Sequence, residues 1–224
     1  MTAAFDTLND ILDARYSCRG YRTDPVPRDT IQAIVRTAQK VPSWCNAQPW
    51  QLTITTGAET DRFREALYAH ASENAPVPDL QWPEGYPGIY GDRRRACGFQ
   101  LYGAVGIEKG DRAAGAKQML ENFRLFGAPH VAIITTPKVL GPYGGVDCGG
   151  FVSAFVMAAQ SHGVATIPQA AVASQAPFVR DWFDLPEDRD VLCAISFGYP
   201  DPDHPANQFR TDRASPDDVI DWRD

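Results

Sequence analysis

The fold of this chain is decided around one stretch, Pro42-Ser43-Trp44-Cys45-Asn46-Ala47-Gln48-Pro49-Trp50. Before it, apolar residues recur at helical spacing from Ile31 to Val41. After it, residues 50–56 have a strand pattern that Gly57 ends. Serine, asparagine and glutamine on this turn can reach the edge of a heteroaromatic ring, but they are also ordinary turn formers. Taken alone, the turn is equally consistent with a binding loop and with a plain connection.

A second polar cluster lies upstream, where a helical pattern that begins at Phe5 ends near Tyr16. The run Arg15-Tyr16-Ser17-Cys18-Arg19 places two guanidinium groups and a hydroxyl within five residues. Such side chains suit bidentate contact with a phosphate and hydrogen bonds to a polyol. The alternative is a solvated basic turn that caps the helix through its last carbonyl groups.

Helix and strand patterns continue through the rest of the chain. We expect helices at 58–74, near 112–126, at 147–162 and around 177–183, and strands at 129–136 and 190–197. The helix at 147–162 is apolar on nearly all sides and contains small residues, which predicts burial on several sides, in the core or in a subunit contact. Strands scattered among helices predict one α+β or α/β layered domain over residues 1–224.

Two stretches do not fit this regular pattern. Prolines and glycines interrupt residues 75–115, where Trp82, Tyr86 and Tyr90 are spaced along a loop, and this predicts a lid or an insertion. The tail around 200–224 contains few apolar residues, so we expect it to lie on a surface that is already folded. We interpret it as an extension that wraps a partner subunit.

The composition excludes several classes of protein. Acidic residues outnumber basic ones 28 to 21, and the formal charge of −7 argues against a nucleic-acid surface. Five scattered cysteines form no CxxC pair and the histidines lack metal-ligand spacing, which indicates a reduced protein without a metal. The start of the chain lacks the pattern of a signal peptide, and no apolar run has the length of a membrane span. We therefore expect a cytoplasmic protein.

Common nucleotide and hydrolase motifs are missing from the sequence. It contains no GxGxxG after a strand, no GxxxxGK[ST], no HExxH and no GxSxG. Rossmann dinucleotide binding, P-loop hydrolysis, zincin chemistry and the α/β-hydrolase elbow therefore lose support. Any nucleotide must be held in another way.

Taken together, in this order and spacing, the two polar segments resemble the nitroreductase family: an RxSxR box, an amphipathic helix, a PSxxNxQPW box and then a strand. The resemblance continues in Gly163–Ala170, in Gly198-Tyr-Pro and in Arg210–Pro216. It covers nearly the whole chain. It implies an α+β, three-layer fold with a small mixed, mainly antiparallel sheet flanked by helices, and a tail that crosses to the partner.

The resemblance also implies a cofactor. Family members bind FMN in the cleft of a homodimer and take electrons from NADH or NADPH, so the flavin carries the chemistry and no side chain acts as nucleophile or general base. Four cations are expected at its phosphate and ring: Arg15, Arg19, Arg210 and Arg213. Ser17 is expected to bind the ribityl chain or the phosphate.

Two further groups of residues are implied at the flavin. The other subunit is expected to contribute Ser43, Trp44, Asn46 and Gln48. The backbone of Pro168, Gln169 and Ala170 is expected to run along the flavin ring. This sequence departs from many relatives in both groups, because Trp44 and Cys45 replace small residues and a proline and a glutamine replace a Gly- or Thr-rich segment.

Residues 87–95 and 122–129 resemble the branch that reduces nitroaromatic acids such as nitrobenzoates. Aromatic side chains at Trp44, Trp82, Tyr86 and Tyr90 suit a flat aromatic substrate, although they can also be packing residues. The leading hypothesis is a ping-pong cycle in which NAD(P)H reduces FMN and a nitroaromatic acceptor then takes the hydride. The alternatives are reductive dehalogenation or ene chemistry on the same flavin, and a flavin-binding dimer without turnover.

Overall fold

The computed structural model describes residues 2–223. Across these residues the chain forms one sheet in the order β1-β2-β4-β3. Its strands are β1 (Gln51–Thr56), β2 (His130–Pro137), β3 (Ala165–Gln169) and β4 (Arg189–Gly198). Its helices are α1 (Ala3–Ala14), α2 (Arg28–Ala38), α3 (Ala58–Glu73), α4 (Ile89–Ala104), α5 (Arg112–Leu120), α6 (Gly141–Ser161), α7 (Ala170–Ala173) and α8 (Ala176–Phe183). Neighbouring strands pair antiparallel throughout.

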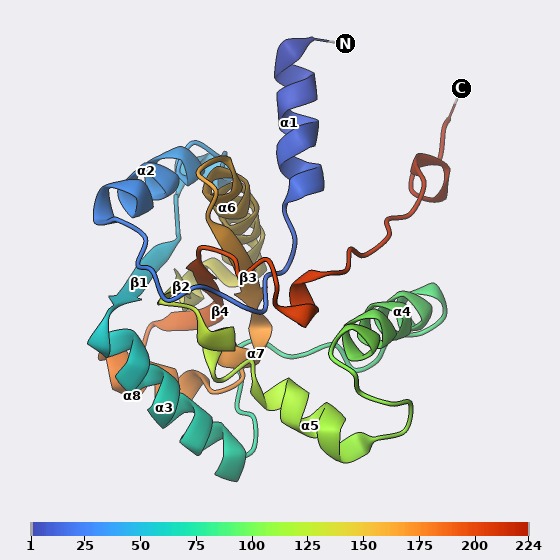
Figure 1. The fold of residues 1–224 in the computed structure, drawn as a ribbon. Helices are drawn as coiled ribbons and strands as arrows, with labels where there is room; N and C mark the ends of the chain where they lie inside the picture. The colour runs from blue at the N-terminus through green and yellow to red at the C-terminus, as the bar shows by residue number, and fades with distance from the viewer. Residues whose placement is uncertain (1, 224) are drawn as a thin grey trace.

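Two apolar cores lie on opposite faces of this sheet (Figure 1). Successive side chains of a strand point to opposite faces, so Ala132 and Ile134 of β2 join the core under α2 and α6. Val131 and Ile133 join the core under α3 and α8. Both faces of β2 are therefore covered, which explains why its sequence is apolar without alternation. The result is a helix–sheet–helix arrangement of three layers.

The structure corrects two expectations about helices. The stretch 75–115 is not one irregular insertion, because α4 occupies residues 89–104 and carries Tyr90, and α5 begins at Arg112. The apolar helix, α6, begins earlier than expected and is not buried on all sides. Its residues Cys148, Phe151 and Phe155 enter the core, whereas Gly149, Gly150 and Ser153 face outward. In the single chain the small residues are thus divided between an exposed face and the buried Ala158 and Ala159, and burial of the exposed face in a subunit contact stays a prediction.

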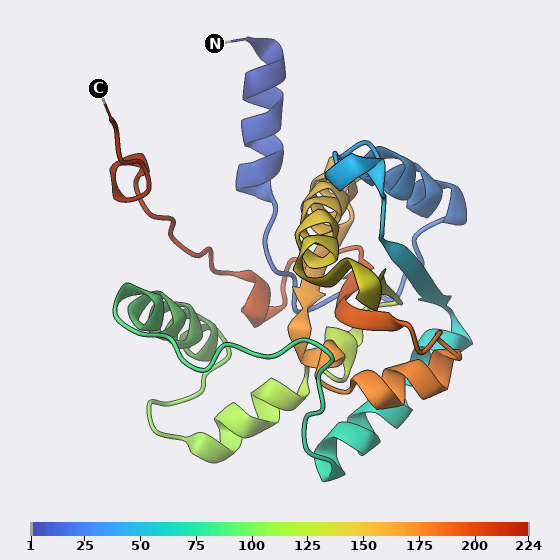
Figure 2. The same ribbon diagram turned by 180° about the vertical axis from the view of Figure 1, so that it is seen from behind.

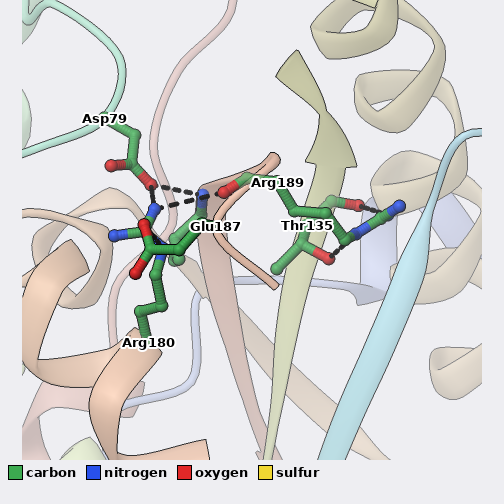
Figure 3. Close-up of polar contacts among 6 residues, drawn as sticks. Asp79, Thr135, Arg180, Glu187 and Arg189 are labelled. Atoms are coloured by element: carbon green, nitrogen blue, oxygen red, sulfur yellow. Dashed lines mark hydrogen bonds and ion pairs between the residues drawn. The ribbon is translucent and has the colours of Figure 1, made fainter. Parts of the chain in front are cut away.

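A buried ion pair fixes the irregular segment before α4 to the sheet (Figure 3). The Asp79 carboxylate accepts hydrogen bonds from the Arg180 guanidinium at 2.6 Å and from the Val191 backbone N–H at 2.7 Å. Both charged side chains are largely buried, with 9% of Arg180 and 14% of Asp79 exposed. Glu187 approaches the same guanidinium at 3.9 Å but is exposed to solvent. Asp79 therefore supplies the main compensation for the Arg180 charge.

Another arginine, Arg189 on β4, holds the turn at 42–50. The Arg189 guanidinium donates to the Thr135 side chain and backbone oxygens and to the Pro49 carbonyl, each at 2.8 Å (Figure 3 shows the contact with Thr135). Through Arg189, Pro49 of the turn is thereby tied to Thr135 near the end of β2.

The two ends of the chain meet at the edge of the body through Asn207, which is 4% exposed. Its Oδ1 accepts from the Arg19 N–H at 2.8 Å, and its Nδ2 donates to the carbonyl groups of Gly20 at 2.9 Å and Asp201 at 2.8 Å. Beyond this contact the tail runs outward, as α1 does at the other terminus (Figures 1 and 2). Asn207 is thus the point at which the tail leaves the folded body.

Replacing Asp79 by alanine should lower the free energy of unfolding by about 3 kcal/mol, because the Arg180 charge stays buried without its partner. Urea denaturation followed by circular dichroism measures this change. Asp92→Ala is the matched control, since Asp92 pairs with Arg95 on the exposed surface of α4 and its loss should leave the midpoint unchanged. Equal destabilisation by the two variants would contradict the assignment.

Replacing Asn207 by alanine should release the tail, because three hydrogen bonds to the 19–20 and 201 backbone are lost together. Limited trypsin digestion should then cut after Arg210 several-fold faster, as read by mass spectrometry. The control is Gln208→Ala, which alters a neighbouring exposed side chain that contacts only the tail's own carbonyl groups. An unchanged cleavage rate in Asn207→Ala would show that another contact fixes the tail.

Candidate active site

The segment that follows α1 is added to the free edge of β3. The Cys18 N–H donates to the Thr166 carbonyl at 3.0 Å, and Ser17 forms an isolated parallel bridge with Thr166. This bridge adds a parallel neighbour to an edge of the antiparallel sheet, as the mixed sheet implied by the resemblance requires, and a second isolated parallel bridge joins Val77 to Gln175. The Cys18 side chain is fully buried, which directs its neighbours Ser17 and Arg19 outward.

A cavity of about 330 Å³ lies where this segment meets the tail. Its walls come from the end of α1, from residues 15–19, from Cys97 on α4 and from residues 209–213. Five of the residues predicted to hold a cofactor line it together: Arg15, Ser17, Arg19, Arg210 and Arg213. Almost 200 residues separate the two groups along the chain, and the Asn207 contact brings them together.

The four arginines concentrate positive charge in this cavity. Burial lowers the pKa of Arg15, and the nearby charges of Arg213 and Arg210 lower it further. Burial also lowers the pKa of Arg19. Among the described residues 2–223, none of the four forms an ion pair with a carboxylate. The Asp13 carboxylate also lines the cavity, but the four cations outnumber it, and this excess of positive charge favours binding of an anion such as a phosphate group.

Aromatic rings keep two of these guanidinium groups in place. Arg19 lies between the rings of Phe126 and Phe209, at 5.8 and 6.0 Å from their centroids. Arg210 lies 3.8 Å from the centroid of the Tyr16 ring. Burial raises the pKa of Tyr16 to about 12, so its hydroxyl stays protonated at neutral pH and can donate to a ligand. Stacking of this kind fixes a planar guanidinium, and although Nη1 of Arg19 and Nη1 of Arg210 donate to backbone carbonyl groups, the remaining N–H donors can still meet an anion.

The predicted turn residues lie elsewhere in the same chain. Ser43, Trp44, Asn46 and Gln48 do not line the arginine cavity. One hydrogen bond lies within the turn, where the Gln48 N–H donates to the Ser43 hydroxyl at 2.9 Å. The turn is also bound to α6, because the Trp44 N–H lies 3.1 Å from both Asp147 carboxylate oxygens. One chain therefore presents two separate halves of the predicted site.

The segment at the end of β3 is more restricted than expected. Pro168 and Ala170 are exposed, but Gln169 is only 3% exposed. The Gln169 amide donates to the Asn122 carbonyl at 2.9 Å and accepts from the Ser196 hydroxyl at 2.5 Å. Its side chain is consequently engaged in the fold, and only its backbone remains for a ligand.

The predicted aromatic lid also lies apart from the arginine cavity. Trp82, Tyr86 and Tyr90 are exposed, and none of them lines it. The Tyr86 ring instead lies 5.3 Å from the Arg94 guanidinium. In the single chain these residues are surface groups near the start of α4.

Sequence analysis missed several residues that build the cavity. Tyr16, Phe209 and Phe126 hold the arginines, and Asn207 fixes the tail. Tyr16 lies inside the RxSxR box and Phe209 precedes Arg210, so adjacency to a predicted cation was the available signal. Asn207 and Phe126 carried none, because their partners are distant in sequence.

No group of three or more His, Cys, Asp or Glu side chains within residues 2–223 is arranged to hold a metal ion. No helix in that range is both long and apolar enough to cross a membrane.

Comparisons with known proteins agree with the geometry. The profile of the Nitroreductase family matches residues 12–199. Nitroreductase NfnB of Mycolicibacterium smegmatis is 35% identical over 206 residues, which cover 91% of this chain and 87% of the relative. The 4-nitrobenzoate reductase of Pseudomonas putida is 28% identical over 213 residues, with 95% and 94% covered.

A solved structure extends the comparison to the whole fold. The FMN-dependent nitroreductase NfnB from Mycobacterium smegmatis, in complex with NADPH, matches with a TM-score of 0.93 at 31% identity, covering 99% of this chain and 100% of that one. The α+β class and the resemblance drawn from the two polar boxes are confirmed. The chain belongs to the nitroreductase family.

Proposed function

We propose that this chain is an FMN-dependent oxidoreductase that uses NAD(P)H to reduce nitroaromatic or related acceptors. The observation that carries the proposal is the arginine cavity, which the two ends of the chain form at the edge of β3. Its cations, hydroxyl groups and flanking rings match the phosphate and polyol of a flavin mononucleotide. Relatives described as FMN-dependent and as a complex with NADPH support the same cofactor and reductant.

The residues of the cavity divide the binding of FMN between them. We assign the phosphate to Arg15, Arg210 and Arg213, which line the cavity together, and the polyol chain to Ser17 beside the edge of β3. Arg19, held between two rings, can direct its charge toward the flavin ring. When bound, FMN supplies the hydride transfer itself, and a nearby positive charge favours its reduced, anionic form.

We further propose that a second copy of the chain completes the site. The turn at 43–48 lies outside the arginine cavity of its own chain, and exposed apolar surface surrounds both parts. On α1, Phe5, Leu8 and Leu12 are each more than 40% exposed, and on α6 the row of small residues is open. Apolar surface of this extent on helices is typical of a subunit interface.

In such a dimer the turn of one chain would meet the arginine cavity of the other. Ser43, Asn46 and Gln48 would then contact the flavin from the partner, and Trp44 would face the acceptor. Val219, Ile220 and Trp222 are exposed in the tail, which supports the proposal that the tail packs on the partner. Trp82, Tyr86 and Tyr90 stay candidates for the acceptor side. A cytoplasmic location and a ping-pong order of substrates also stay predictions.

Replacing Arg19 by alanine should weaken FMN binding at least ten-fold, because a charge-assisted contact of about 1.5–3 kcal/mol is lost. Titration of apoprotein with FMN, followed by flavin fluorescence, measures the Kd. Arg22→Ala is the matched control, since Arg22 is exposed in the same segment and pairs only with Asp24. Wild-type protein should be yellow and should bleach anaerobically with NADPH or NADH.

The same preparation separates the proposed function from its alternatives. Protein that stays colourless with added FMN contradicts the cofactor assignment. Bound FMN that stays oxidised under excess NADH and NADPH indicates a flavin-binding protein without turnover. Turnover of halophenols or enones but not of nitroarenes indicates dehalogenation or ene chemistry.

Mixing two inactive variants should restore activity if the site is composite. The Arg15→Ala/Arg19→Ala chain lacks a working cavity, and the Asn46→Leu chain lacks a working turn. A mixed dimer contains one site in which both defects coincide and one in which neither is present. Joint refolding of equal amounts should therefore recover about one quarter of the wild-type activity per chain, since about half of the dimers are mixed. Activity no higher than that of the separate variants would place each site within one chain.

A further inference from the structure

The start of α6 holds Trp44 at two points. The Trp44 N–H lies 3.1 Å from each oxygen of the Asp147 carboxylate. The Trp44 ring meets the Tyr143 ring edge-on, with centroids 4.3 Å apart and planes at 81°. Tyr143 and Asp147 are one helical turn apart, so they lie on the same face of α6. Backbone and side chain of Trp44 are thus held by one rigid element.

The turn needs such an anchor because its backbone is strained. Cys45, Asn46 and Gln48 have φ values of 51°, 57° and 48°, in the left-handed region that favours glycine. Residues held there persist only where their surroundings impose the conformation. Asp147 at one end of the turn and the bond from Arg189 to the Pro49 carbonyl at the other provide that constraint.

A pocket of about 350 Å³ opens beside this clamp. Apart from Trp44 and Tyr143, its walls are mainly small or apolar, and Leu140 and the 90% exposed Val139 lie on the helix side. Asp147 is the one charged residue among the described residues that line it. No ion pair within residues 2–223 includes Asp147, so its charge is met only by the Trp44 N–H.

We propose that Trp44 and Tyr143 form an aromatic wall for the acceptor ring, and that Asp147 makes the site select neutral nitroarenes over nitroaromatic acids. The inference rests on the proposed function, in which the turn carrying Trp44 faces the acceptor. Asp147 acts in two ways: its oxygens position Trp44, and its charge repels a carboxylate on the acceptor. A flat, uncharged ring can stack against Trp44 without being repelled by the Asp147 charge.

The size of the charge effect follows from Coulomb's law. Two like charges about 8 Å apart, at an effective permittivity of about 40, repel by enough to lower kcat/KM roughly five-fold. Salt screens an effect of this kind, whereas the packing of Trp44 against Tyr143 does not depend on salt. Charge selection and positioning can therefore be measured separately.

The test compares nitrobenzene with 4-nitrobenzoate on the FMN-loaded enzyme. Asp147→Asn keeps an oxygen acceptor for the Trp44 N–H and removes the charge. It should raise the ratio of kcat/KM for 4-nitrobenzoate to that for nitrobenzene about five-fold. In the wild type, added salt should raise this ratio toward the value of the variant, and in Asp147→Asn salt should leave it constant.

Two further variants separate the roles of Asp147. Asp147→Leu removes both the acceptor and the charge, so it should lower kcat/KM for nitrobenzene, and the asparagine variant should restore it. Glu73→Gln removes one negative charge from an exposed position on α3, which packs on the opposite face of the sheet, and should not change the ratio. Flavin content per chain, measured by absorbance, should be equal in all variants.

The outcomes discriminate between this inference and the proposed function. A ratio that Asp147→Asn leaves unchanged, or that Glu73→Gln shifts equally, overturns charge selection at Asp147. Equal loss with leucine and asparagine overturns the positioning role. A wild-type protein that binds no FMN or reduces neither nitroarene refutes the proposed function, and the inference with it.

Discussion

The contact between the two ends of the chain is the constraint on which the candidate site depends. Asn207 bonds the backbone on both sides of the peptide that joins Arg19 to Gly20, and this fixes the tail against the segment added to β3. Gly20 permits the close approach, since a Cβ at this position would lie 2.1 Å from the His204 ring. The cavity needs both pairs of cations: Arg15 and Arg19 from the start of the chain, and Arg210 and Arg213 from the tail. A contact between uncharged groups therefore assembles the cluster of charges.

That cluster is unfavourable without a ligand, which is informative about its purpose. Burial, and then the charges of Arg213 and Arg210, lower the pKa of Arg15, so the folded chain holds desolvated and mutually repelling groups that the unfolded chain keeps apart. The buried Arg180 has a different setting, because it lies against the Asp79 carboxylate. Arg19, Arg210 and Arg213 donate only to neighbouring carbonyl or hydroxyl oxygens, and within residues 2–223 none of the four cavity arginines forms an ion pair, which supports binding of an anion as their role.

The sequence predicted those features whose causes are local. The helix at 58–74 and the strands at 129–136 and 190–197 were predicted within one or two residues, because periodicity and burial agree there. The helix α4 was missed, since glycines and prolines before it concealed its start. The strand β3 was not recognised as such, because it is short and contains Pro168, which is tolerated on the side away from β4.

The candidate site shows the same division. The residue types of the two boxes pointed to phosphate and flavin, and the cavity brings Arg15, Ser17 and Arg19 of the first box together with Arg210 and Arg213 of the tail. Whether a residue lies at the cavity or at the turn depends on packing between segments that are distant in sequence. The sequence therefore did not predict the hydrogen bond between Asn207 and the Arg19 N–H, or the one between the Gln169 side chain and the Asn122 carbonyl. For the same reason the single chain leaves the turn at 43–48 apart from the cavity, and in the proposed dimer the pairing of two chains would unite them.

Separating the turn from the cavity also gives the protein a way to vary its substrate. The arginine cavity is tied to the sheet edge and to the tail, so changes there would alter the cofactor. The turn is held instead by the first turns of α6 and by Arg189, and neither group lines the cavity. A change of side chain at Trp44 can then reshape the proposed acceptor side without altering the arginine cavity. An anchored, strained turn on a rigid helix suits that task, because Asp147 fixes the backbone of Trp44 whatever side chain the position carries.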